Sequence, residues 1–164
     1  MDKMLVQCVS QKAYEKAFDL DVKYGCCPQC VLAAVKEATG LVSDELIQAS
    51  HGLSGGGGLM GEGTCGALSG GLLALGSIKG RPADQLDQGR GMENFQAGKA
   101  LVERFQEAFG GTSCQDLQRQ FTGREWDLWE QAEYKGFSDA RGDGCAHATG
   151  LVTQWVAEEL LECC

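Results

Sequence analysis

The chain has 164 residues, and its 14 lysines and arginines against 23 aspartates and glutamates give a net charge of −9. This length suits one domain whose core is large enough to fold without disulfide bonds. The composition, 43% apolar and 23% charged, is that of a globular protein and not of a disordered one. An acidic surface repels phosphate groups, so we expect neither a nucleic acid nor an anionic membrane as a partner.

The chain also carries no sequence signal for export or for membrane insertion. Its first residues lack the basic segment and apolar run of a secretory signal. The longest stretch of apolar and small residues, 67–78, is shorter than the roughly 20 residues that a membrane helix needs. We therefore expect a cytoplasmic location.

Apolar residues recur with helical spacing along the chain, and no segment alternates as a strand would. The pattern predicts helices at residues 2–20, 27–39, 43–49, 65–78, 92–109, 114–121, 125–137 and 145–162. Thr122 and Glu125 have the spacing of a capping box at the start of the seventh. A glycine-rich loop at 52–63 separates the third helix from the fourth. With no internal repeat and no boundary, the sequence predicts a single all-α domain over 1–164, a bundle of about seven or eight helices.

The cysteine content is unusual for a chain without a secretory signal. There are nine cysteines, an odd number, so disulfide bonds within one chain cannot pair them all. In a reducing compartment such a content is more typical of metal binding or redox chemistry than of structural disulfides.

Four of these cysteines occupy equivalent positions on four predicted helices. Each lies in a first helical turn, just after turn or capping residues, and begins an apolar stripe. The four are Cys27, Cys65, Cys114 and Cys145. The free N–H groups of a first turn favour a thiolate and lower its pKa. We therefore predict that the four thiols share one site. The alternative is an interaction domain in which buried cysteines only fill the core.

The segment from Cys27 to Cys30 is a Cys-x-x-Cys motif, which places two thiols on one helix face. Such a motif serves thiol–disulfide exchange or forms half of a metal site, but here no strand precedes it and no second motif accompanies it. We keep Cys30 and Cys26 as alternative ligands. Cys8 is expected to be a packing residue, and the terminal Cys163 and Cys164 are exposed thiols or additional soft-metal ligands.

Small residues line one face of the predicted helix at 65–78. Gly66, Gly70 and Ala74 follow one another at intervals of four, which allows another helix to approach closely. This face either packs within the chain or forms a homodimer.

Several short segments resemble the C_GCAxxG_C_C family of redox-active proteins. The segments are Tyr24 to Leu32, the glycine run from Gly55, the motif from Thr64 to Gly70, the segment from Thr112 to Leu117, and Cys145. The family is marked by four dispersed cysteines, which fall here on Cys27, Cys65, Cys114 and Cys145. Similar segments occur in split-Soret-type cytochromes, and this resemblance implies an iron–sulfur or electron-transfer setting. The chain departs from the usual pattern at Cys30 and in its two terminal cysteines.

We therefore predict an iron–sulfur protein that transfers electrons to or from a redox partner protein. The ligands are Cys27, Cys65, Cys114 and Cys145, with Cys30 or Cys26 as alternates, and four thiolates suit either a 2Fe–2S or a 4Fe–4S cluster. A second hypothesis is a thiol–disulfide oxidoreductase that uses Cys27 and Cys30. A third is a non-catalytic protein that binds a soft metal such as zinc or copper.

Overall fold

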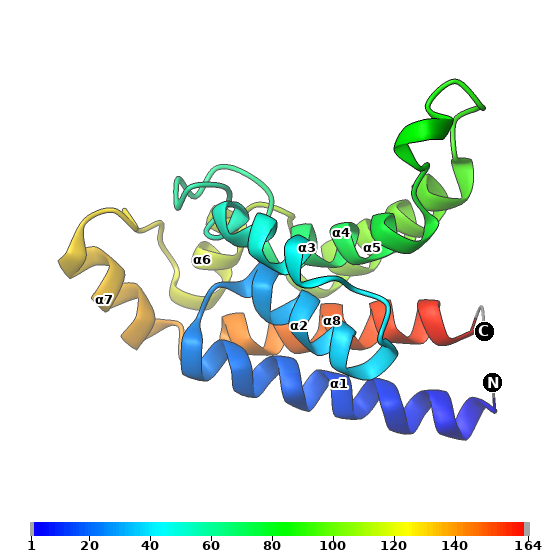
Figure 1. Cartoon of the computed structure of the whole chain (residues 1–164). Helices are drawn as coiled ribbons and strands as arrows, with labels where there is room; N and C mark the ends of the chain where they lie inside the picture. The colour runs from blue at the N-terminus through cyan, green and yellow to red at the C-terminus, as the bar shows by residue number, and fades with distance from the viewer. Residues whose placement is uncertain (1, 163–164) are drawn as a thin grey trace.

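The computed structural model describes residues 2–162, and within them eight α-helices and two short 3₁₀ turns form one body without strands (Figure 1). The α-helices are α1 (Lys3–Tyr24), α2 (Cys27–Thr39), α3 (Asp44–Ala49), α4 (Gly66–Lys79), α5 (Met92–Phe109), α6 (Cys114–Thr122), α7 (Gln131–Ala140) and α8 (Gly144–Glu162). The turns are η1 (Ser50–Leu53) and η2 (Ala83–Gln85). The predicted all-α class and number of helices are confirmed.

The long helices α1 and α8 lie side by side and run in opposite directions (Figure 1). The buried stripe of α1 consists mostly of small residues, Val6, Ser10, Ala13 and Ala17, and it ends at Asp21. Small side chains let two helices approach closely. Further support comes from the Tyr14 hydroxyl, which lies 2.8 Å from Nδ1 of His147. The middle of α1 is thereby fixed beside the first turn of α8.

Helices α2 and α4 approach each other through the glycines of α4. A Cβ atom on Gly70 would lie 2.9 Å from the Cα and the carbonyl oxygen of Pro28, and one on Gly66 would lie 2.8 Å from the Pro28 ring. No side chain fits between these backbones. The small-residue face of α4 therefore packs within the chain, which is one of the two outcomes that the sequence left open.

The core lies between α2, α4, α5 and α8. Its largest fully buried side chains include Leu32, Leu68, Leu75, Phe105 and Val152. The predicted apolar stripes of these helices meet there. No helix in residues 2–162 is both long enough and apolar enough to cross a membrane.

The predicted helix at 125–137 is wrong, because α7 begins only at Gln131. Gly123 ends α6 in the left-handed conformation, with a φ of 80°. The backbone N–H of Trp126 then donates to Oε1 of Gln118 at 2.8 Å, and its indole N–H donates to the Thr122 hydroxyl at 2.8 Å. These bonds hold residues 124–130 as a loop against α6, so the capping-box spacing of Thr122 and Glu125 does not start a helix.

Candidate cysteine site

The four cysteines singled out by the sequence do lie at the N-termini of four helices. Cys27 and Cys114 are the first residues of α2 and α6, Cys65 precedes α4, and Cys145 is the second residue of α8. Gly25 ends α1 with a φ of 65°, and Pro28 in the first turn starts α2. Local turn and capping chemistry thus positions each thiol.

The starts of α4 and α6 are joined through their backbones. The N–H of Cys65 donates to the carbonyl of Thr112 at 2.7 Å, and the N–H of Cys114 donates to the carbonyl of Gly63 at 3.0 Å. Ser113 caps α6 in a reciprocal capping box with Asp116. Two cysteines that are far apart in the sequence are therefore held close together by main-chain bonds.

The start of α8 packs against α6. A Cβ atom on Gly144 would lie 2.8 Å from the ring of Phe121, so the backbone next to Cys145 comes very close to this ring. Charge on Cys145 also raises the pKa values of the thiols of Cys27, Cys65 and Cys114, which places Cys145 near all three.

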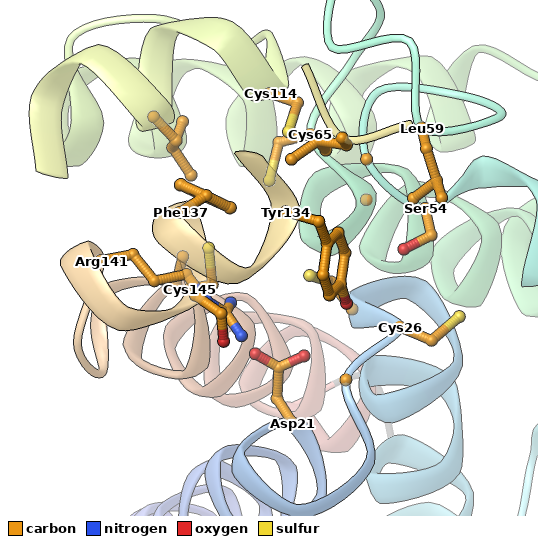
Figure 2. Close-up of a pocket in the computed structure, with 18 residues that line it drawn as sticks. Asp21, Cys26, Ser54, Leu59, Cys65, Cys114, Tyr134, Phe137, Arg141 and Cys145 are labelled. Carbon is orange, nitrogen blue, oxygen red and sulfur yellow. The ribbon is translucent and has the colours of Figure 1, made fainter. Parts of the chain in front are cut away.

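All four thiols line a single cavity of about 70 Å³ (Figure 2). Cavities that bind organic cofactors and drug-sized ligands usually measure about 300–1,000 Å³. This cavity is therefore too small for a nucleotide or a haem, and its size suits a small inorganic group. In Figure 2 the thiols of Cys114 and Cys145 point toward each other across it.

Residues from α7 and from the glycine-rich loop complete the wall of the cavity. Tyr134, Phe137 and Arg141 contribute from α7 and its C-terminal end, while Ser54 and Leu59 contribute from the loop. The indole N–H of Trp129 donates to the carbonyl of Gly58 at 2.9 Å. This bond joins the segment before α7 to the loop, so two elements that cover the cavity are held together.

Burial reverses the expected effect of the helix N-termini on the thiols. Desolvation raises the pKa values of Cys27, Cys65 and Cys145, and it raises the pKa of Cys114 to about 11. Backbone amides at the start of α4 lower the pKa of Cys65 only in part. In the absence of a bound cation the four side chains are therefore thiols at neutral pH.

A buried carboxylate faces the same cavity. Asp21 is 2% exposed, and neither of its carboxylate oxygens has a hydrogen-bond partner. Burial raises the pKa of this carboxyl, and the charge of Arg141 lowers it only in part. In Figure 2 the Asp21 carboxylate points toward the Arg141 guanidinium, although no ion pair within 4 Å joins these two described residues.

The other predicted cysteines behave differently. Cys26 lines the cavity, but its sulfur turns away from Asp21 and Arg141 (Figure 2). Cys30 is buried and does not line the cavity, because its thiol donates to the carbonyl of Gly25 at 2.9 Å. Cys8 is exposed on α1 and is therefore not the packing residue that we expected. Cys163 and Cys164 lie outside the described residues.

The cavity includes residues that the sequence analysis missed, chiefly Asp21, Arg141 and Tyr134. A signal for Asp21 does exist, since it continues the spacing of Ala13 and Ala17 on the buried face of α1. The predicted helix ended at residue 20 and so left Asp21 out. No signal marks Arg141 or Tyr134, which reach the cavity only through the fold of residues 124–141.

Among residues 2–162, no three His, Cys, Asp or Glu side chains are grouped as a single metal ion would require. The thiols are instead distributed around the cavity.

The comparisons with known proteins identify one family. A family model described as "Putative redox-active protein (C_GCAxxG_C_C)" matches residues 25–159, which include all four cysteines of the cavity. No significant match was found among curated proteins or among solved structures. The match begins after Asp21, so this carboxylate lies outside the matched residues.

Proposed function

The chain belongs to the C_GCAxxG_C_C family, and we propose that it holds an iron–sulfur cluster on Cys27, Cys65, Cys114 and Cys145 and transfers single electrons. The observation that carries the proposal is that four helices, distant in sequence, each have one of these cysteines within one residue of their first residue, and that all four line one small cavity.

The chemistry of the donors supports an iron–sulfur centre. Five cysteines line the cavity, the four proposed ligands and Cys26, and histidine, the common second ligand of zinc and copper sites, is absent from its lining. Among the described residues no three such side chains are grouped as ligands of one metal ion. A cluster, in which each metal atom takes its own thiolate, needs no such grouping. We therefore favour a cluster over a soft-metal site with a single zinc or copper ion.

The electrostatics of the cavity point the same way. Buried thiols lose their protons only when positive charge compensates the resulting thiolates, and the irons of a cluster would supply it. The Arg141 guanidinium lies beside Cys145 and lowers the pKa of its thiol. It would offset part of the negative charge of a thiolate-bound cluster. When bound, the cluster supplies the one-electron chemistry, and the protein excludes water from it.

Two observations weigh against thiol–disulfide exchange by Cys27 and Cys30. Burial raises the pKa of Cys30 to about 12, whereas an exchanging thiol needs a pKa near the ambient pH. The Cys30 thiol also donates to the carbonyl of Gly25, and Cys30 does not line the cavity that Cys27 lines. The electron donor or acceptor would instead be a redox partner protein.

Single cysteine substitutions test the assignment of the ligands. After anaerobic reconstitution with ferrous iron and sulfide, we expect Cys65→Ser and Cys145→Ser to retain much less iron than the unmodified protein. Cys30→Ser is the matched buried control, and Cys8→Ser is the exposed one. Loss of iron in the two controls, or its full retention in the cavity variants, would overturn the assignment.

A further inference from the structure

We propose that the Asp21 carboxylate is an oxygen ligand of the metal centre, so that the cavity offers a mixed set of four sulfur donors and one oxygen donor. This inference rests on the proposed function, since it concerns the same cavity. Four observations about Asp21 support it.

The first observation is the position of Asp21 in the fold. It is the last member of a buried stripe on α1 that otherwise consists of alanine, serine and valine. A small apolar residue would continue the packing of α1 against α8 at this position. The chain instead places an ionisable group there, at the point where the stripe meets the cysteine cavity.

The second observation is that the carboxylate lacks hydrogen-bond donors. Nearly every buried carboxylate accepts hydrogen bonds or pairs with a cation, because an isolated one is costly to desolvate. Both oxygens of Asp21 are buried without a hydrogen-bond partner of normal geometry. The thiol of Cys27, a weak donor and itself a cysteine of the cavity, and the charge of Arg141 lower the pKa of this carboxyl only in part. A cation bound in the cavity would satisfy them, whereas a purely structural role leaves them unexplained.

The third observation concerns the charges that face Asp21. From the elements around it come Arg141 and the thiols of Cys27, Cys30, Cys26 and Cys145, with each of which Asp21 interacts electrostatically. Arg141 supplies one positive charge, but no ion pair within 4 Å joins it to the carboxylate. Four thiolates and one carboxylate would therefore need the positive charge of metal ions.

The fourth observation is the direction of the side chain. In Figure 2 the carboxylate points into the cavity from the α1 side, below Cys145 and Arg141. A carboxylate oxygen is a harder donor than a thiolate sulfur. An iron atom that binds Asp21 would therefore differ in its electronic environment from irons that bind only sulfur.

Mössbauer spectroscopy of protein reconstituted with ⁵⁷Fe and sulfide tests the proposal without an activity assay. In the unmodified protein we expect one iron site to be distinct from the others. In Asp21→Asn, which keeps the shape but loses the anionic oxygen donor, this distinction should disappear. Iron should then pass to a chelator about tenfold faster. Asp19→Asn, on the exposed face of the same helix, is the control with the same change in charge.

A second variant keeps the test decisive if Asp21→Asn folds poorly. Asp21→Cys replaces the oxygen donor with sulfur, so we expect it to retain iron while losing the distinct site. An asparagine can still make hydrogen bonds, but it cannot supply an anionic oxygen ligand. Identical Mössbauer spectra and identical rates of iron release in Asp21→Asn and the unmodified protein would therefore overturn the proposal. If the unmodified protein takes up no cluster at all, the proposed function itself fails.

Discussion

Gly70 and Pro28 hold α4 and α2 so close that a Cβ atom on the glycine would lie 2.9 Å from the backbone of the proline. This contact involves the residue directly after Cys27, and it joins two of the four helices that supply the cavity. Residues 65–70 have the sequence Cys-Gly-Ala-x-x-Gly, and the position of the second glycine, Gly70, has a physical reason, because two backbones meet there.

We expect Gly70→Ala to lower the free energy of unfolding by about 1–3 kcal/mol, since overpacking would push α2 and α4 apart. Gly76→Ala is the matched control in the same helix, because a Cβ atom there meets nothing within 4 Å. Replacing an unhindered helical glycine stabilises by roughly 0.5–1 kcal/mol. Urea unfolding of both variants measures the difference, and equal stabilities would contradict the close approach.

The capping box of Ser113 and Asp116 positions Cys114. We expect Ser113→Ala to cost about 1 kcal/mol of stability, because it removes the side-chain acceptor of the first turn. The bonds to the Ser113 backbone and side chain lower the pKa of Asp116 to about 2, below its ordinary value of 3.8. The contribution of this carboxylate to stability is therefore present above pH 4 and is lost as the pH falls toward 2. Thermal unfolding between pH 2 and pH 7 measures both effects, and Ser77→Ala on α4 is the control.

The bond from Trp129 to Gly58 joins the segment before α7 to the glycine-rich loop, and both segments contribute to the wall of the cavity or adjoin it. Trp129 is 69% exposed, so Trp129→Phe removes the hydrogen bond with little loss of packing. A bond of this kind contributes about 1 kcal/mol, so we expect the cavity thiols of the metal-free protein to react about fivefold faster with a thiol reagent. The exposed Cys8 is an internal reference. Unchanged labelling of the cavity cysteines would show that this bond does not restrict access.

The buried charge of Asp21 makes the metal-free protein less stable at neutral pH. Burial raises the pKa of this carboxyl above its ordinary value of 3.8, so the folded state binds a proton more tightly than the unfolded state does. The loss of folding stability caused by the buried charged carboxylate is absent well below pH 3.8, and it grows as the pH rises above that value. We expect metal-free Asp21→Asn to be more stable than the unmodified protein at pH 7, by about 1 kcal/mol or more, and equally stable near pH 3. A lower stability at pH 7 would contradict this account.

The positions of the four cysteines could be predicted because local signals determine them. Each comes within two residues after a glycine, serine or threonine, and each opens an apolar stripe that must face the core. The cover of the cavity could not be predicted in this way. The loop before α7 depends on bonds from Gln118 and Thr122 to Trp126, which are invisible to helical periodicity.

The ionisation of the thiols also depends on information beyond local sequence. A helix N-terminus favours a thiolate when the thiol remains in contact with water, and this was the expectation for the four cysteines. In the folded protein they are enclosed by α7 and the glycine-rich loop, so desolvation dominates. The balance between these two effects is set by residues far away in the chain, such as Phe137 and Leu59.

The most direct test of the central claim is chemical analysis of the protein purified and reconstituted without oxygen. We predict iron and acid-labile sulfide in equal amounts, with a visible absorption band that bleaches when dithionite is added. A colourless protein that takes up neither iron nor sulfide, or one whose spectrum does not respond to dithionite, would contradict the claim that the four cysteines hold a redox-active cluster.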